Sequence, residues 1–460
     1  MFNLSDTIAA VCTPPGVGGI AAIRISGIDS WSIIQKIFCS KCETEDHRLT
    51  GSLAYKLNHM QALHGFIRDN NKIIDEVIIL PFKSPKSFTT EDIVEIFCHG
   101  GNKIASVILD LCLKHGARIA GNGEFTFRAF INGRIDLTEV EAIHEIIYAD
   151  TTRAVYASSE VLAGSLKNKL NDFKQRLLEL VTVMESSMEF PMDVSSVEKE
   201  DINLQLNLIN NEFNELIQNS ESGQVIRDGI KVSIVGVPNV GKSSLLNQLL
   251  ENQRAIVTSE PGTTRDTIEE KVVINGYPFV FIDTAGIRHR KCFSEAEQHG
   301  TNRSKDAIEN SDIVLFVFDV SRDQNKESEE IYKLIDGKPK IIVGNKVDLI
   351  DQEVKADICI SAKYGTNIDK LKALLFETTK SIHSHYNNGK KIYVNQRQRE
   401  LLLQCCSIMS FIVNMISINE SEDLIADELK KVISKLNEIS GLQVGEDVIA
   451  NIFAKFCIGK

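Results

Sequence analysis

The sequence predicts an α+β domain at the N-terminus, a helical bundle made of a middle and a C-terminal stretch, and an α/β domain inserted between the two helical stretches. Apolar residues at steps of three and four, typical of one helix face, occur on both sides of residues 230–380. Between them, apolar strand runs alternate with helical segments, as in a parallel sheet with crossover helices. The simplest architecture lets the two helical stretches pack as one domain.

The N-terminal domain is expected over residues 1–120, where short β-rich runs alternate with helical ones. We expect strands at Ile20–Ile25, Leu63–Ile67 and Val77–Leu80, and a helix at Ile104–His115. Gly116 supplies the stop signal for this helix. This pattern is typical of a small domain of mixed strands and helices.

The helical domain is expected over residues 121–218 and again over residues 381–460. One apolar face of a long helix is formed by Leu162, Leu166, Leu170, Phe173, Leu177, Val181, Met184 and Met188. A second face is formed by Leu424, Ile425, Leu429, Val432, Leu436 and Ile439. The inserted domain, residues 219–380, has expected strands at Val232–Val235, Phe279–Ile282, Ile313–Phe318 and Lys340–Val343. Amphipathic faces of this length require a packing partner.

Composition excludes several classes of protein. Hydrophobic residues make up 43% of the 460-residue chain and charged residues 25%, as in ordinary globular proteins. The formal net charge of −12 argues against a uniformly basic nucleic-acid surface, so nucleic-acid binding would need a local patch or a partner. The ten cysteines are scattered, and the start of the chain lacks a secretory pattern, so reduced thiols in the cytoplasm are expected. The apolar run Ile408–Ile418 is too short for a bilayer and predicts a buried helix rather than a membrane protein.

A phosphate-binding loop is predicted at Gly236–Ser243, which fits the pattern GxxxxGK[ST]. The loop follows an apolar strand and precedes the helical run Ser244–Leu250, which is the context that the motif requires. Backbone amides would face the phosphates, and Lys242 would reach the terminal ones. The hydroxyl of Ser243 would bind Mg²⁺.

Further motifs follow in order and indicate a Ras-like P-loop GTPase fold. Asp283–Gly286 ends a strand and suits the water shell of Mg²⁺ and the γ-phosphate. In Asn345–Asp348, the last carboxylate can accept from the N1-H and 2-amino groups of guanine, a pattern that adenine lacks. Ser361–Lys363 completes the base pocket. The polar loop Gly262–Asp266 is a switch candidate, with Thr264 as a second Mg²⁺ ligand.

The residue after the DxxG glycine is Ile287, where Ras-like enzymes carry a water-orienting Gln. Catalysis therefore needs another water-orienting group and another positive charge. Polar residues that could supply them follow directly: Arg288, Arg290, Glu295 and Glu297. A monovalent cation is a second source of charge, because Asn239 offers an amide oxygen beside the phosphates. Asn239 could instead only stabilise the loop turn.

The chain resembles the MnmE (TrmE) family of tRNA-modification GTPases. The resemblance is carried by Thr7–Ala10 with Pro14–Gly16, Ile23–Gly27, Ser87–Thr89 with Glu91-Asp92, His99–Gly101, Gly123–Thr126, Asn132–Leu137, Gly262–Asp266 and the final Phe456–Lys460. These motifs run nearly the whole length of the chain, and an FC[IV]GK ending on a GTPase is a specific signal.

The resemblance implies an activity and partners. Family members act with a flavin-dependent partner of the MnmG (GidA) type, expected here as a heterotetramer. Together they install an aminomethyl-type group, such as (carboxymethyl)aminomethyl, on C5 of wobble uridine 34 of tRNA. The one-carbon unit derives from a reduced folate such as 5-formyltetrahydrofolate, bound by the N-terminal domain. The family forms homodimers through that domain, and its G domains pair in the presence of GTP and potassium.

The resemblance also assigns residues. Folate contacts would be Arg24, Glu95, Arg134 and Lys460, and potassium ligands Asn239, Thr258, Glu260 and Thr263. The expected nucleotide contacts are Asn239, Val240, Gly241, Lys242, Ser243, Ser244, Thr258, Ser259, Glu260, Pro261, Gly262, Thr263, Thr264, Asp283, Thr284, Ala285, Gly286, Asn345, Lys346, Val347, Asp348, Ser361, Ala362 and Lys363. Two residues depart from the family pattern: Arg134 replaces the usual Lys, and Phe127 replaces a polar residue.

Some assignments stay open. The water-positioning acid is Glu297 when counted back from Gly300, and Glu295 when counted forward from Gly286; we favour Glu297, with Arg288 beside it. Cys457 is either a nucleophile beside the folate or a small apolar residue of a packed helix. The alternative function is a ribosome-assembly switch of the Era/Der kind, which should carry a KH-type RNA-binding module. The sequence does not distinguish ammonium from glycine as second donor, nor does it show which tRNAs are modified.

Overall fold

The computed structural model describes residues 3–40, 57–70, 72–189, 199–251, 270–282, 307–322, 326–350, 354–382 and 392–460. The chain divides into two compact units. The first comprises Met1–His144, Leu166–Gln175 and Ile433–Lys460, and the second comprises Glu145–Ser165 and Arg176–Val432. Both units combine segments from either side of the predicted boundaries near residues 120, 218 and 380, and those boundaries stay predictions.

A seven-stranded sheet of described residues forms the centre of the first unit, in the order β3-β4-β5-β6-β2-β1-β7. The strands are β1 (Ile8–Val11), β2 (Ile20–Ser26), β3 (Phe38–Ser40), β4 (Leu63–Asp69), β5 (Lys72–Phe82), β6 (Ile93–His99) and β7 (Arg118–Ile119). Neighbouring strands are antiparallel except β1 and β7, which are parallel. The strands predicted around residues 20–25, 63–67 and 77–80 are confirmed, each within a longer strand.

The two faces of this sheet have different partners because side chains alternate along a strand. In β2, Ala21, Ile23 and Ile25 belong to the apolar core formed with helices α1 (Ser30–Ile37) and α2 (Asn102–Lys114). The helix predicted at residues 104–115 is thereby confirmed as α2. Arg24 and Ser26 alternate with these core residues, so they lie on the opposite face of the sheet.

On that opposite side of the sheet lies α3 (Glu124–Ile131), whose Phe125 packs with Ile8 and Ala10 of β1. Helix α3 in turn shares a core with α4 (Leu137–Ile147) and α15 (Glu446–Ala454). Phe127 and Phe453 are buried in a shared core, with ring centroids 5.2 Å apart in an edge-to-face arrangement. This contact gives a physical reason for Phe127, where the family usually has a polar residue: its ring fills the space beside α15.

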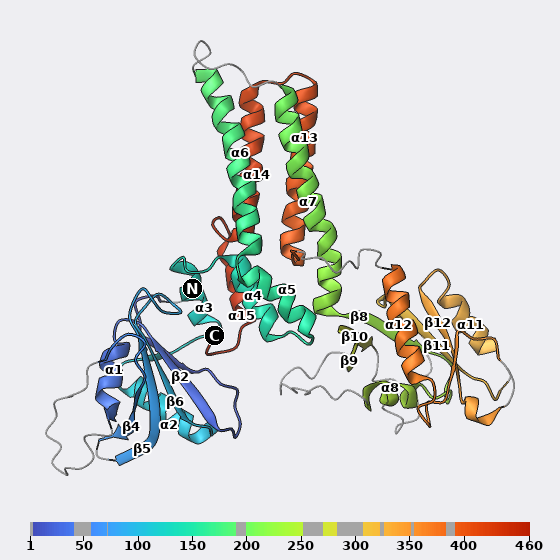
Figure 1. Cartoon of the computed structure of the whole chain (residues 1–460), viewed down its shortest axis with the longest axis horizontal. Helices are drawn as coiled ribbons and strands as arrows, with labels where there is room; N and C mark the ends of the chain where they lie inside the picture. Colours follow the sequence, from blue (N-terminus) through green and yellow to red (C-terminus); the bar gives the residue numbers. More distant parts are fainter. Residues whose placement is uncertain are drawn as a thin grey trace. The chain divides into compact units, whose positions relative to one another are not determined.

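Four long helices form a bundle in the second unit: the later part of α6 (Ser165–Glu189), α7 (Lys199–Asp228), α13 (Gln396–Ser417) and the first part of α14 (Glu422–Ser440). Helix α5 (Thr152–Leu162) of the same unit contacts α7. Figure 1 shows α6 beside α14 and α7 beside α13, and Glu185 of α6 forms a 2.9 Å ion pair with Lys430 of α14. The predicted α14 face is confirmed for its five buried residues, Ile425, Leu429, Val432, Leu436 and Ile439, but not for Leu424, which is 47% exposed. The single helical face from Leu162 to Met188 is partly wrong, because Leu162 ends α5 and Gly164 adopts a φ of +92° before α6 begins.

Helix α13 contains the apolar run predicted as a buried helix. The run belongs to a helix of 22 residues, so the expectation that it is too short for a bilayer is corrected: by length and composition α13 could cross one. Its Leu401, Leu402, Met409 and Ile412 are buried, and the helix packs along α7. Core helices of proteins without a membrane span can be equally long and apolar. The predicted burial of this helix is confirmed for one of its faces.

Described residues of the second unit also form a six-stranded sheet, in the order β13-β12-β11-β8-β10-β9. Its strands are β8 (Ile230–Val235), β9 (Glu270–Ile274), β10 (Tyr277–Ile282), β11 (Ile313–Asp319), β12 (Lys340–Asn345) and β13 (Ile358–Ile360). The helices near it are α8 (Lys242–Glu251), α11 (Lys326–Leu334), the 3₁₀ turn η2 (Val347–Leu349) and α12 (Ile368–Ile382). All neighbours are parallel except β9 and β10. The predicted inserted α/β domain is confirmed.

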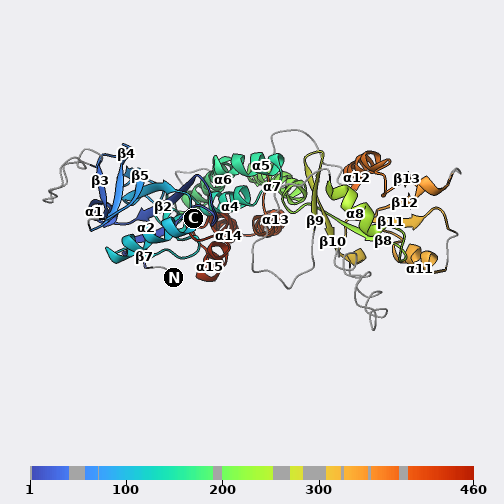
Figure 2. The ribbon, with the colours of Figure 1, turned by 90° about the horizontal axis from the view of Figure 1, so that it is seen from below.

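Helices cover both faces of this sheet, α8 and α12 on one side and α11 on the other (Figure 2). Strand β11 shows why: Ile313, Leu315 and Val317 join the core with α8 and α12, whereas Val314, Phe316 and Phe318 join the core beside α11. A parallel strand buried on both faces is apolar throughout. The carboxyl ends of β8, β11 and β12 meet at one edge, and the predicted nucleotide motifs follow directly from these ends.

Candidate functional site

The phosphate-binding loop connects β8 to α8. Asn239 adopts a left-handed backbone with φ of +71°, and Gly241 has a φ of +100°. A Cβ added at Gly241 would lie 2.2 Å from Asn345 Nδ2, so only glycine fits there. Lys242 Nζ donates to the carbonyl oxygens of Gly236 and Val237, at 2.5 and 2.9 Å. Ser243 and Ser244 lie in the first turn of α8, so their backbone amides are part of a helix N-terminus suited to an anion.

Asn345 joins three of the predicted nucleotide motifs. Its Nδ2 donates to the carbonyl oxygen of Val240 at 2.8 Å. Its Oδ1 accepts from the backbone amides of Lys346 and Ala362, at 2.8 and 2.9 Å. The side chain is buried, so its hydrogen bonds link the phosphate loop to the base pocket, and it does not present an exposed contact to the base.

Asp348 and Ser361, predicted for guanine recognition, are brought together. Ser361 Oγ donates to Asp348 Oδ1 at 2.5 Å, which leaves Oδ2 of the carboxylate for a further donor. Lys363 is exposed, and its ammonium lies 4.9 Å from the ring centroid of Tyr364. The contact with the Tyr364 hydroxyl raises the pKa of Lys363. Val347 begins the turn η2 that carries Asp348.

Asp319, at the end of β11, is a residue beside the nucleotide motifs that the sequence prediction did not include. It pairs in register with Asn345 at the end of β12, and its Oδ2 accepts from Lys346 Nζ at 2.5 Å. The other oxygen accepts from the amide and hydroxyl of Ser321, at 3.0 and 2.6 Å. Burial alone would raise the pKa of Asp319, but the hydrogen bonds from Lys346 and Ser321 lower it. The sequence feature that could have pointed to Asp319 is an acidic residue at the end of the apolar strand that comes directly before the strand ending in Asn345.

Several predicted residues lie outside the described part of the chain. They are Thr258, Ser259, Glu260, Pro261, Gly262, Thr263, Thr264, Asp283, Thr284, Ala285, Gly286, Arg288 and Glu297. Strand β10, which is parallel to β8, ends at Ile282, and the DTAG motif that follows it in the sequence lies outside the described residues.

In the first unit, three of the four residues assigned to folate line one pocket of about 720 Å³. Arg24 of β2 and Glu95 of β6 are direct cross-strand neighbours on the face opposite the α1–α2 core. Arg24 Nε and Nη2 both bond to Glu95 Oε1, at 2.9 and 2.8 Å, so Oε2 of Glu95 is left for another donor. The guanidinium carbons of Arg24 and Arg134 lie 5.0 and 4.9 Å from the ring centroid of Phe88.

The C-terminal motif packs on the N-terminal domain within the same unit. Phe125 N donates to the carbonyl oxygen of Lys460 at 3.1 Å, and a Cβ at Gly459 would lie 2.4 Å from the carbonyl oxygen of Val11. Burial raises the pKa of the Cys12 thiol, and the charges of Arg24 and Lys460 oppose this rise. Lys460 does not line the pocket itself.

Cys457 is exposed, and its carbonyl oxygen accepts from Gly123 N at 3.4 Å. Of its two predicted roles, the buried apolar one is not what the structure shows. The neighbouring Phe456 is the buried anchor of the motif, with 2% of its surface exposed. Within the described residues, clusters of three or more His, Cys, Asp or Glu suited to a metal ion are absent.

Comparison with known proteins gives matches along the whole chain. The family profile described as MnmE helical domain matches residues 137–457, and the profile described as GTP-binding protein TrmE N-terminus matches residues 7–134. The tRNA modification GTPase MnmE of Thermoanaerobacter pseudethanolicus is 40% identical, covering 99% of this chain and 99% of that protein. The chain belongs to the MnmE family of tRNA modification GTPases. The MnmE of Thermotoga maritima is 37% identical over 99% of this chain and 100% of its own length.

Among solved structures, Aquifex aeolicus Era bound to GDP·AlF4⁻ is 28% identical, covers 39% of this chain and 66% of that chain, and has a TM-score of 0.26. The MnmE relatives instead align end to end, so the alternative of an Era/Der-like switch is set aside. Membership of the family makes the chain a GTP-hydrolysing enzyme, as predicted. GTPases of this kind use Mg²⁺, and the Ser243 hydroxyl beside Lys242 fits the ligand set expected for that ion.

Proposed function

We propose that the protein hydrolyses GTP while it modifies C5 of wobble uridine 34 in tRNA, together with a flavin-dependent partner of the MnmG type. The main observation behind this proposal is that one chain contains both a phosphate-binding loop and a separate pocket, which is lined by two arginines, a carboxylate and an aromatic ring: Arg24, Arg134, Glu95 and Phe88. The pocket would take a reduced folate such as 5-formyltetrahydrofolate, which supplies a one-carbon unit when bound. We place the enzyme in the cytoplasm, in keeping with the thiols of the described residues, which form no disulfide with one another.

The chemistry of the pocket supports a folate. Arginine guanidinium groups pair with carboxylates in a bidentate manner, as the glutamate tail of a folate would require. The free Oε2 of Glu95 can accept from the amide and amine donors of a pterin ring. Because Arg24 is already fixed by Glu95, its orientation costs little on binding. Lys460, whose charge acts on the Cys12 thiol as that of Arg24 does, would add positive charge for the glutamate carboxylates.

The nucleotide site supports guanine. Asp348 keeps one carboxylate oxygen for N1-H and the 2-amino group, while Ser361 holds the other. Lys242 and the amides of the loop would bind the phosphates, and Ser243 with Thr264 would bind Mg²⁺. Asn239 in its left-handed conformation, with Thr258, Glu260 and Thr263, would bind potassium. Glu297 would position the attacking water, with Arg288 beside it.

A homodimer through the N-terminal domain is supported by its exposed apolar residues. Val17 is 99% exposed, Ile28 82% and Ile20 66%, all in the first unit. Val17 precedes β2 and Ile20 begins it, so the two can share one apolar patch of the kind found at interaction surfaces, whereas Ile28 follows the other end of that strand. Binding of the MnmG-type flavoprotein to this dimer would give a heterotetramer.

The test is nucleoside analysis of tRNA from cells that lack this protein, complemented with variants. The wild type should restore the modified uridine, and Arg24→Ala should not. Glu139→Gln changes a carboxylate of the same unit outside the pocket, so it is the matched control and should restore modification. Unchanged wobble uridine in cells that lack the protein would contradict the proposed function.

A further inference from the structure

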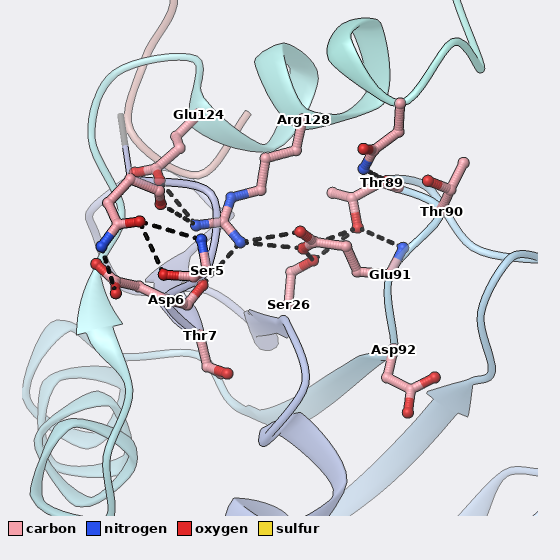
Figure 3. A network of polar contacts seen from close by, with 12 residues as sticks. Ser5, Asp6, Thr7, Ser26, Thr89, Thr90, Glu91, Asp92, Glu124 and Arg128 are labelled. Atoms are coloured by element: carbon pink, nitrogen blue, oxygen red, sulfur yellow. Dashed lines mark hydrogen bonds and ion pairs between the residues drawn. The ribbon is translucent and has the colours of Figure 1, made fainter. Parts of the chain in front are cut away.

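A buried arginine lies beneath the proposed folate pocket without lining it. Arg128 of α3 is fully buried, and Figure 3 shows its guanidinium between two carboxylates. Nη1 bonds to both oxygens of Glu91 at 3.1 Å, and Nη2 bonds to Glu124 Oε1 at 3.1 Å. The same nitrogens donate to the carbonyl oxygens of Asp6 and Asn3, at 2.8 and 3.2 Å. Both terminal nitrogens of the buried guanidinium are therefore bonded to groups on three chain segments, whereas its Nε is buried without a hydrogen-bond partner.

Glu124 belongs to the same network and is held from the opposite side by Arg118, whose Nη2 lies 2.7 Å from its Oε1. Burial alone would raise the pKa of Glu124, but the hydrogen bonds from Arg118, Gly121 N and Arg128 lower it. Arg128 thus has an ionised partner on α3 itself. Its second carboxylate, from Glu91, is the one that a different segment supplies.

Glu91 connects Arg128 to residues 83–92, here called the pocket loop. Its Oε2 also accepts from Ser26 Oγ of β2 at 2.6 Å, and its backbone carbonyl accepts from Ser87 Oγ at 2.5 Å. Thr89 is buried within the same group, and its carbonyl oxygen accepts from Asn132 Nδ2 at 2.7 Å. These contacts hold the pocket loop from the sheet below and from the end of α3.

The pocket loop carries the aromatic ring of the pocket. Phe88 lies between Ser87 and Thr89, both of which are held by the network, and its ring contacts the guanidinium groups of Arg24 and Arg134. A shift of the loop would move this ring and release both arginines. Arg128 itself lies outside the lining of the pocket.

We propose that Arg128 is a positioning residue for this pocket, which acts through Glu91 to fix the loop that places Phe88 between Arg24 and Arg134. The inference rests on the proposed function of the pocket. Its physical basis is that Arg118 and Arg128 share Glu124, so Glu91 is the carboxylate that balances the second guanidinium. Removal of one partner from a buried ion pair is strongly unfavourable, so the loop has one well-defined arrangement. An apolar pair of similar volume would stabilise the core equally well but would not fix the loop in this way.

The test compares Glu91→Gln with Glu139→Gln in the full chain. Glu139 is also nearly buried and accepts from Lys167 Nζ at 3.0 Å and Asp136 N at 2.7 Å, but it does not line the pocket. Calorimetric titration with 5-formyltetrahydrofolate, well below the unfolding midpoint of each variant, should give a Kd raised about tenfold in Glu91→Gln. The Kd of Glu139→Gln should stay within about twofold, and GDP binding should be unchanged in both.

A double-mutant cycle separates positioning from a general loss of stability. If Glu91 acts through the ring, Glu91→Gln should add little to the loss already caused by Phe88→Leu. Additive losses, or an unchanged Kd in Glu91→Gln, would overturn the inference. If Glu91→Gln does not fold, Ser26→Ala removes the 2.6 Å hydrogen bond to Glu91 Oε2 from a residue outside the pocket lining, and it should raise the Kd about threefold.

Hydrogen exchange keeps the two proposals distinct. Amides of residues 86–90 should exchange faster in Glu91→Gln than in the wild type or in Glu139→Gln, whichever ligand the pocket takes. Faster exchange together with no folate binding by the wild type would reject folate and support the positioning role. Unchanged exchange would reject the positioning role even if the wild type binds folate.

Discussion

Replacement of Asp319 by Asn should weaken guanine-nucleotide binding, although Asp319 lies outside the predicted motifs. Its carboxylate is 5% exposed and holds the ammonium of Lys346, the second residue of the NKVD motif, at 2.5 Å. An Asn keeps one oxygen for Ser321 but turns an amide donor toward the ammonium. Lys346 would then leave its place next to the base pocket that Asp348 and Ser361 form.

The size of the effect follows from the contact. A hydrogen bond to a charged group contributes about 1.5–3 kcal/mol, and the lost one is short and shielded on the Asp319 side. Lys346 is 29% exposed, so water recovers part of this energy. We therefore expect affinity for GDP to fall roughly tenfold, which corresponds to about 1.4 kcal/mol.

Fluorescence titration with a labelled GDP measures this effect. Asp336→Asn is the matched control, because Asp336 pairs with Lys340 at 3.2 Å but is 84% exposed, and exposed pairs contribute little. An affinity in Asp319→Asn equal to that of the control would refute the reasoning. Because the pKa of Asp319 is lowered, its contribution to stability is complete above its unfolded value of about 3.9. It is lost only as pH falls further, so the Asp319 effect should be constant between about pH 5 and pH 8.

Three further predictions follow. Gly241→Ala should abolish GDP binding while circular dichroism shows a retained fold, since its Cβ would lie 2.2 Å from Asn345 Nδ2; normal binding would contradict this. Acidification below about pH 6.5 should lower the unfolding temperature, because burial beside Phe456 lowers the pKa of His144 and the unfolded chain therefore binds the proton first. His144→Gln should reduce this pH dependence of the unfolding temperature. An equal pH dependence in the variant would exclude His144 as its source. GTP hydrolysis should be faster in KCl than in NaCl at equal ionic strength, and Asn239→Ala should remove most of the difference; equal rates would exclude a potassium site at Asn239.

Local sequence determined the elements of the nucleotide site. The loop at Gly236–Ser243 follows from one strand, one glycine-rich turn and one helix start, all contiguous in the chain. Such a motif needs no distant contact to be recognised, because backbone conformation and spacing carry it. For the same reason the apolar strands of the inserted domain and the α14 face were predicted with nearly their observed bounds. The break between α5 and α6 was missed because Leu162 continues the apolar spacing across Gly164.

Tertiary structure decided the contacts between residues far apart in the chain. Arg24 and Glu95 were each assigned to a folate, but only the pairing of β2 with β6 shows that they bind one another and share one pocket. Asp319 meets Lys346 because two parallel strands end in register, and a strand pattern alone does not specify its neighbour. From the sequence alone, Arg128 would be predicted as an exposed residue of a helix. Its burial between Glu91 and Glu124 depends on how α3 packs against a loop some 40 residues earlier, a contact that helix periodicity does not contain.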